Sequence, residues 1–88
     1  MIDNALTHPG PFRHELEVAQ AIERIAALSP REHEVLAGLL AGLPNKTIGY
    51  DLNISVRTVE VHRARLMERL GVQTFAEVIR LGVLASLR

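Results

Sequence analysis

Apolar residues recur along this chain at intervals of three and four positions, the spacing of one face of an α-helix. In residues 12–28, for example, Val18, Ile22 and Ile25 fall on a common face. No stretch alternates apolar and polar residues with a period of two, so no sheet is predicted. We therefore expect an all-α fold: a leading helix over about residues 12–28, then four shorter helices. Residues 1–11, which end in Pro-Gly-Pro, are predicted to be an irregular lead-in.

Capping residues mark the ends of the second predicted helix. Ser29 and Glu32 have the Ser-x-x-Glu spacing of a capping box, and Pro30 suits the first helical position. Gly42 is placed to end this helix, and Pro44 prevents its continuation.

A helix-turn-helix is predicted next. Asn45 is expected to cap a short helix over Lys46–Leu52, and Ser55 to cap a longer amphipathic helix over about residues 56–70. A short helix, a tight turn and a longer helix in this order make a helix-turn-helix. In that motif the second helix lies in the major groove of DNA while the first crosses the backbone.

The helix over residues 56–70 separates apolar from basic residues. Its predicted core-facing residues are Val56, Val59, Leu66, Met67 and Leu70. Val61 projects to the opposite side, where it can meet a thymine methyl group in the major groove, although a single exposed valine is also common on protein surfaces. Ala64 lets the helix approach the bases closely, and Glu60 can accept a hydrogen bond from cytosine N4 or pair with a neighbouring arginine. The surrounding donors for phosphate or guanine are Arg57, Thr58, Arg65 and Arg69, with Lys46 and Tyr50 on the preceding helix.

The segment "LSPREHEVLAGLLAGLPNKTIGYDLNISVRTVEVHRARLMERLGV" resembles the LuxR-type helix-turn-helix, especially the output domains of FixJ- and NarL-like response regulators. The resemblance runs from about Leu28 to Leu84 and implies a four-helix DNA-binding domain that regulates transcription. It also implies a homodimer on inverted-repeat sites in double-stranded DNA. Gly49 departs from the alanine usual in the family. By position, the resemblance assigns base contacts to Glu60, Val61 and Ala64, and contacts at or near phosphates to Asn45, Lys46, Thr58 and Arg65.

The domain organisation follows from the same match. Residues 1–27 resemble no receiver or other sensor domain, so we divide the chain into an N-terminal segment, 1–27, and a LuxR-type domain, 28–88. A free-standing regulator and an excised output domain both fit this division. The operator, the controlling signal and the direction of regulation are left open by the sequence.

Charge and composition narrow the class of protein. The formal net charge is zero, but residues 1–34 hold six acidic and three basic side chains, whereas residues 35–88 hold four acidic and seven basic ones. This asymmetry weakly favours a polyanionic partner for the second part. The chain has no cysteine, no apolar run near the ~20 residues that span a bilayer, and no signal-peptide pattern at its start. A cytoplasmic protein without membrane contact is expected.

Other chemistry is not predicted. The four histidines have no metal-ligand spacing, and no catalytic motif or phosphate-binding glycine loop occurs. We therefore expect no enzyme, metal, cofactor or small-molecule ligand. Arg63 faces the core side of its helix, so its guanidinium needs a partner, for which Glu32 or Glu34 is the candidate. The alternative is that its stem packs on apolar residues while its head reaches water.

The last helix begins with a second capping box, Thr74 with Glu77, and is too apolar for one buried face. Phe75, Val78, Leu81 and Ala85 are expected in the core, and the surplus suggests a partner. The predicted dimer contact comprises Ile79, Val83, Leu84 and Leu87.

Two alternatives to the LuxR-type reading stay open. One is a sigma-factor region-four-like module that recognises a promoter together with RNA polymerase. The other is a helical protein-interaction module, with residues 12–28 as its docking element.

Overall fold

The structure is a computed structural model that describes residues 11–87, and its regular elements are helices. Because no strand occurs within those residues, the predicted all-α fold is confirmed. Of the irregular lead-in expected over residues 1–11, residues 1–10 lie outside the described residues, whereas Pro11 belongs to the first described helix. In chain order the helices are α2 (Pro11–Ala26), α3 (Pro30–Leu40), α4 (Asn45–Leu52), α5 (Val56–Leu70) and α6 (Phe75–Ser86).

Both predicted capping boxes form. Ser29 Oγ accepts a hydrogen bond from the Glu32 backbone N–H at 3.1 Å, and Glu32 Oε1 accepts one from the Ser29 N–H at 3.0 Å. Thr74 and Glu77 make the same reciprocal pair at the start of α6. These side chains satisfy backbone donors that a helix start leaves without partners.

The other helix limits also follow the sequence, except that α2, expected over about residues 12–28, ends at Ala26, and that α4 begins one residue earlier than expected. Gly42 and Gly71 adopt the left-handed conformation, at φ +79° and +71°, after α3 and α5, where glycine is favoured because it has no Cβ. The N-cap of α4 is Pro44 and not Asn45, and it makes no side-chain capping bond. Asn45 already belongs to the helix, because the extended backbone of Pro44 supplies the boundary.

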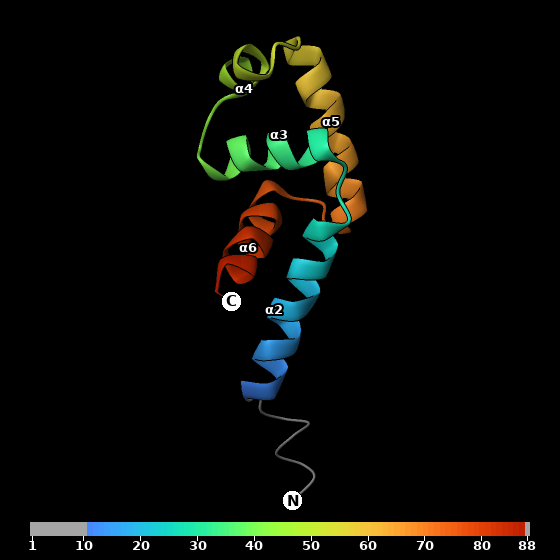
Figure 1. Ribbon diagram of the computed structural model, residues 1–88, viewed down its shortest axis with the longest axis vertical. Helices are drawn as coiled ribbons and strands as arrows, with labels where there is room; N and C mark the ends of the chain where they lie inside the picture. Colours follow the sequence, from blue (N-terminus) through green and yellow to red (C-terminus); the bar gives the residue numbers. More distant parts are fainter. Residues whose placement is uncertain (1–10, 88) are drawn as a thin grey trace, which may run out of the picture.

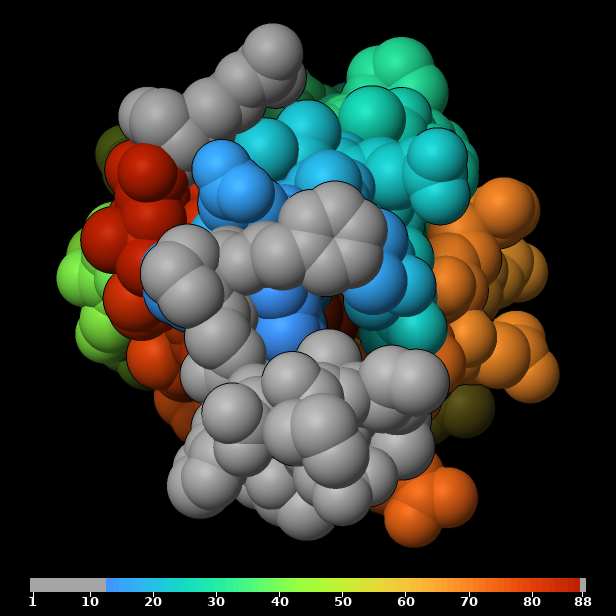
Figure 2. Space-filling view, turned by 90° about the horizontal axis from the view of Figure 1, so that it is seen from below, coloured from blue at the N-terminus to red at the C-terminus, as the bar shows by residue number. Residues whose placement is uncertain are grey.

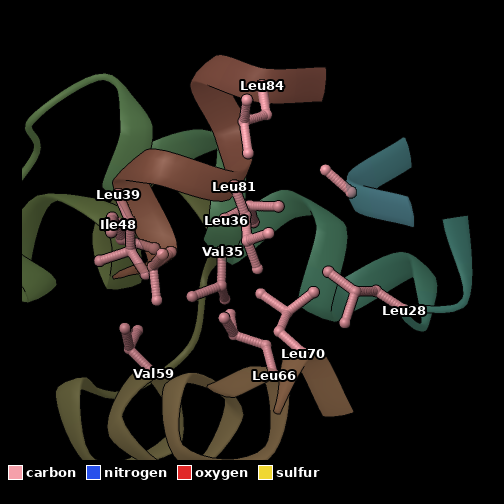
Figure 3. Packing of buried hydrophobic residues seen from close by; sticks show 12 residues of the cluster. Leu28, Val35, Leu36, Leu39, Ile48, Val59, Leu66, Leu70, Leu81 and Leu84 are labelled. Atoms are coloured by element: carbon pink, nitrogen blue, oxygen red, sulfur yellow. The ribbon is translucent and has the colours of Figure 1, made fainter. Parts of the chain in front are cut away.

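One aliphatic core joins all five helices. On α5, Val59, Leu66 and Leu70 are fully buried and point toward Val35 of α3 (Figure 3). The leading helix α2 takes part through Ala21, which is also fully buried. Its neighbours Val18 and Ile25 pack on the same cluster.

The helices are arranged in two groups. At one end α4 packs on α5, and α3 crosses between that pair and α6 (Figure 1). At the other end α2 and α6 lie side by side, as Figure 2 shows from below. Among residues 11–87, no helix is long and apolar enough to cross a membrane.

Three apolar residues differ from their predicted places. Val56 and Phe75 are exposed although both are expected to face the core, because each occupies the first turn of its helix, before full packing begins. Leu84 is only 9% exposed and belongs to the core. Since α6 packs against α2, a wider arc of its surface is covered than a single core-facing stripe.

Candidate nucleic-acid interface

The turn between α4 and α5 fixes how these two helices cross. Asn53 adopts the left-handed conformation at φ 58° and ends α4. The Ile54 N–H then donates to the Gly49 carbonyl at 2.9 Å. A Cβ built on Gly49 would lie 2.8 Å from the Ile54 carbonyl oxygen, so the helix and the turn approach more closely than an alanine allows. In the helix-turn-helix, α4 and the turn that follows it are therefore in close contact at Gly49 and Ile54.

The outer face of α5 presents the predicted base-contacting residues together. Val61 is 42% exposed, and Glu60 and Ala64 are also exposed. On the opposite face Val59 and Leu66 are fully buried. The predicted outward direction of Val61 is thus correct, because its side chain lies on the surface beside the exposed residues Glu60 and Ala64.

The predicted phosphate contacts lie on α4 and on α5, where they range from the first turn to Arg65. Tyr50 is 87% exposed, and Lys46, Arg57 and Arg65 are exposed as well. Asn45 and Thr58 are half-buried. Thr58 is held by Ser55, whose Oγ accepts from the Thr58 backbone N–H at 3.0 Å and lies 2.9 Å from Thr58 Oγ1.

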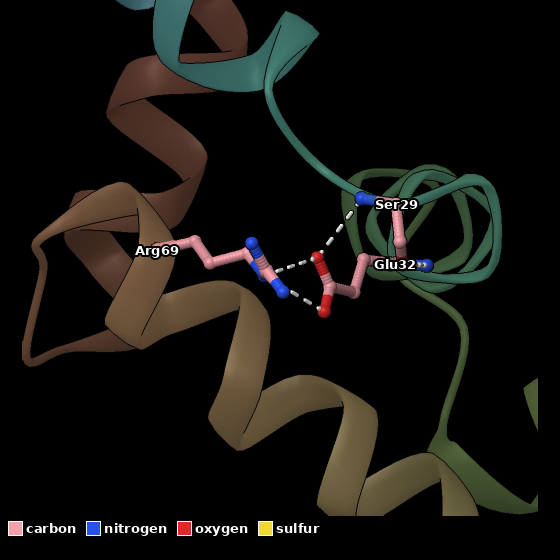
Figure 4. A network of polar contacts seen from close by, with 3 residues as sticks. All are labelled: Ser29, Glu32 and Arg69. Atoms are coloured by element: carbon pink, nitrogen blue, oxygen red, sulfur yellow. Dashed lines mark hydrogen bonds and ion pairs between the residues drawn. The ribbon is translucent and has the colours of Figure 1, made fainter.

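The predicted ion pair of Arg63 is wrong. The carboxylate of Glu32, which is buried, pairs with Arg69, whose Nε lies 3.0 Å from Oε1 and 3.2 Å from Oε2 (Figure 4). Glu34 pairs with Arg31 at 3.2 Å. The Arg63 guanidinium instead lies over the ring of Phe75, 4.9 Å from its centroid, a cation–π contact.

This network lowers the pKa of Glu32. The backbone N–H of Ser29 has the largest effect, and the charge and hydrogen bond of Arg69 add to it, whereas burial acts in the opposite direction. Because Arg69 is committed to Glu32, its guanidinium is directed toward α3. The DNA surface proposed below therefore leaves out Arg69, which the sequence places at a phosphate.

No group of acidic, histidine or cysteine side chains suited to a metal ion occurs in the part of the chain that the structure describes. His62 is half-buried, and its Nδ1 is a buried atom without a hydrogen-bond partner among the described residues.

Sequence reasoning missed one contact of α5. Arg24, in the last turn of α2, donates from Nη1 to the backbone carbonyl of Leu70 at 3.3 Å, across 46 positions of the chain. The only sequence signal is a basic residue near the end of a helix, and its own helix is the usual partner for such a charge.

The predicted dimer residues divide into two sets. Val83 and Leu87 are 53% and 56% exposed, and Ile79 is half-buried. These three have the i, i+4, i+8 spacing of one helical stripe. Leu84, predicted with them, lies in the core.

Comparisons with known proteins agree with this geometry. A family model described as "Bacterial regulatory proteins, luxR family" matches residues 26–81. The transcriptional regulatory protein FixJ of Bradyrhizobium diazoefficiens is 42% identical over 88 residues, which cover 99% of this chain and 43% of that protein. FixJ of Rhizobium meliloti is 48% identical over 83 residues, or 93% of this chain and 41% of the relative. The C4-dicarboxylate transport transcriptional regulatory protein DctR of Rhodobacter capsulatus is 42% identical over 85 residues, or 92% and 43%.

A solved structure is similar as well. The crystal structure of full-length FixJ from B. japonicum matches with a TM-score of 0.81 and 38% identity, covering 100% of this chain and 44% of that one. The present chain thus spans less than half the length of the relatives that it matches.

Proposed function

Because this chain belongs to the luxR family of bacterial regulatory proteins, we propose that it binds specific sites in double-stranded DNA and regulates transcription, with α5 in the major groove. The observation that carries the proposal is the exposed valine and alanine at positions 61 and 64. They lie between arginines on the outer face of α5, whose opposite face buries Val59, Leu66 and Leu70. Such a face offers a thymine methyl group an apolar partner and the phosphates a set of cations.

The predicted DNA contacts on this surface have the following proposed roles. Val61 and Ala64 contact base edges, and Glu60 accepts a hydrogen bond from cytosine N4. In support, Glu60 is exposed on this face and forms no ion pair within residues 11–87. The proposed phosphate contacts are Asn45, Lys46, Tyr50, Arg57, Thr58 and Arg65.

The proposed DNA-binding unit comprises residues 28–88, and residues 1–27 form a separate N-terminal segment. The unit acts by binding and not by catalysis. The luxR match favours this function over the sigma-factor-like alternative. RNA polymerase is a candidate partner of the bound regulator, and the cytoplasm, where bacterial DNA lies, is the proposed location. The relatives named above are transcriptional regulatory proteins.

On DNA we propose a homodimer that contacts an inverted repeat through α6. The support is the stripe of Ile79, Val83 and Leu87, whose exposed part has no partner within the described chain. The proposed interface consists of these three residues. Leu84, predicted with them from the sequence, lies in the core and is left out.

Selection of bound sequences from random double-stranded DNA, followed by mobility-shift titration at several salt concentrations, tests the DNA-binding function. We expect one preferred site and steep weakening as salt rises, because bound cations displace counterions from the phosphates. A helical protein-interaction module would select no sequence, and that outcome would overturn the proposal.

Two substitutions separate base from phosphate contacts. Val61→Ala should weaken discrimination at one thymine by ~1 kcal/mol or more, with little change in stability because Val61 lies outside the core. Lys46→Ala should weaken binding to all sequences alike and flatten the salt dependence by about one unit of slope. Gln20→Ala, at an exposed position on α2, is the control and should change neither property. Loss at a single operator position in Lys46→Ala would contradict its phosphate role.

A further inference from the structure

The far end of the proposed recognition helix is held by a residue of the leading helix. Leu70 is the last residue of α5, and its carbonyl accepts the hydrogen bond from Arg24 Nη1. The carbonyls of the last helical turn have no partners within their own helix. A cation there also interacts favourably with the negative end of the helix dipole. Arg24 therefore donates a hydrogen bond to the Leu70 carbonyl. Its positive charge also interacts favourably with the negative end of the α5 dipole.

At the end of α5 the carbonyl of Leu70 accepts from Arg24, whereas two earlier carbonyls of the last turn have backbone partners. The N–H of Gly71 donates to the carbonyl of Glu68, and that of Val72 donates to the carbonyl of Met67. A second arginine acts at the same end, where Arg69 joins α5 to α3 through Glu32. The end of α5 is thus tied to two helices by two separate guanidinium groups.

The helix that provides Arg24 is itself anchored. Ala21, one turn before Arg24, is 1% exposed and lies in the core. One turn before Ala21, on the same face of α2, the Glu17 carboxylate lies 3.8 Å from Arg80 of α6. Because α2 is fixed to the core and to α6, its hydrogen bond to Leu70 can hold the end of α5 in place.

The position of that end matters for residues that it does not touch. Val61 precedes Leu70 by nine residues, which is ~14 Å along a helix. Arg24 is therefore too far from the proposed base contacts to act on them directly, but a change in the tilt of α5 would move them. Binding residues must be held within about 10–20° of their productive orientation.

We propose that Arg24 is a positioning residue for DNA recognition, through which α2 holds α5 at the tilt that its base contacts require. The inference rests on the proposed DNA-binding function. It also goes beyond it, because Arg24 lies outside the residues 26–81 that the family model matches. In this inference the leading helix is part of the recognition apparatus although it presents nothing to the DNA.

The test uses the full chain with Arg24→Gln, Arg24→Lys and, as a control of equal charge change, Arg13→Gln at an exposed position earlier in α2. Two DNA probes are compared: the site selected with the native chain, and an unrelated duplex of equal length. We expect Arg24→Gln to weaken binding to the selected site about five-fold and to the unrelated duplex less than two-fold. Arg24→Lys should recover part of the loss, because an ammonium group can also donate to the carbonyl.

Two further measurements separate positioning from other roles. The salt slope of Arg24→Gln should equal that of the native chain, because Arg24 makes no phosphate contact in the proposal; a slope flatter by about one unit would show a direct phosphate contact instead. The carbonyl carbon resonance of Leu70 should shift in Arg24→Gln and not in Arg13→Gln.

The outcomes distinguish this inference from the function on which it rests. If the native chain selects a site and Arg24→Gln binds it with native affinity, the positioning role is overturned and DNA binding stands. Equal losses on both probes, or equal losses in Arg24→Gln and Arg13→Gln, would overturn it as well. If the native chain selects no site, the proposed function itself fails.

Discussion

Glu32 performs two structural tasks with one buried carboxylate. It closes the capping box of α3 with Ser29 and pairs with Arg69 of α5 (Figure 4). The pairing joins the start of a scaffold helix to the end of the proposed recognition helix. A single side chain thus helps to determine both where α3 begins and how α5 lies against it.

The lowered pKa of Glu32 makes part of the stability dependent on pH. A carboxyl whose pKa is lower in the folded state contributes stability above its unfolded pKa of about 4.3, and this contribution is lost as the pH falls through the folded value. The pKa of Glu77 is lowered as well, first by the N–H of Gln73 and then by Thr74. Acidification below about pH 4.3 should therefore destabilise the protein through both residues.

Glu32→Gln should reduce the acid-dependent loss of stability. Glutamine can still complete the capping box, so we expect the fold to persist at pH 7 with a loss of about 1 kcal/mol, since the Arg69 partner is more than half exposed. Denaturant unfolding between pH 3 and 7 measures the effect. Glu34→Gln, which alters an exposed pair with Arg31, is the control. An unchanged pH dependence in Glu32→Gln would refute the assignment.

The crossing of α4 and α5 depends on a small residue. A Cβ on Gly49 would meet a backbone oxygen at 2.8 Å, and that atom cannot move without the turn. Gly82 of α6 provides a contrast, because a Cβ there would meet the end of the exposed Leu40 side chain at 2.6 Å. The same added methyl group therefore displaces backbone in one case and a side chain that can rotate in the other.

Gly49→Ala and Gly82→Ala should consequently differ in stability. Replacing a helical glycine by alanine gains up to ~1 kcal/mol of helix propensity, whereas overpacking costs about 1–3 kcal/mol. We expect Gly82→Ala to leave the free energy of unfolding unchanged or to raise it. The Gly49→Ala variant should be about 1–2 kcal/mol less stable than the Gly82→Ala variant. Thermal unfolding of both variants measures the difference. A stabilised Gly49→Ala would show that the turn accommodates the alanine usual in this family.

The whole molecule has two proposed functional surfaces at different places: the outer face of α5 for DNA and the outer stripe of α6 for a second copy. In the apolar stripe of α2, Val18 and Ile25 pack on the core and Ile22 is half-buried, so most of this stripe is covered within the chain. The exposed stripe of α6 is therefore the surface that we propose for self-association. Burying one large aliphatic side chain contributes roughly 1.5–3 kcal/mol, while association costs at least several kcal/mol of rigid-body freedom.

The free chain should therefore be largely monomeric at micromolar concentration and dimeric on two adjacent half-sites, which hold both copies in place. Val83→Glu should abolish cooperative binding to the double site and leave binding to one half-site unchanged. Sedimentation and mobility shifts measure the two effects. Ala37→Glu, an equal charge change at an exposed position on α3, is the control. Cooperative binding that survives in Val83→Glu would move the interface away from α6.

The helices and their limits were predictable because their signals are local. Ser29 with Glu32 and Thr74 with Glu77 determine helix starts by bonds within three residues, and Gly42 and Gly71 mark ends through their own backbone. The outward direction of Val61 likewise follows from helical periodicity alone. The sequence by itself therefore determined the all-α fold, the helix-turn-helix and the face that we propose for DNA.

Partners far apart in the chain were decided only by the tertiary structure. Glu32 could meet either of two arginines on α5, Arg63 or Arg69, and the crossing of α3 over α5 selects Arg69. Packing of α2 on α6 places Leu84 in the core and not on the surface, and the contact of α2 with α5 brings Arg24 to Leu70. Periodicity determines which residues share a face of one helix, but the residue that meets that face depends on how two helices cross, and no local pattern records that angle.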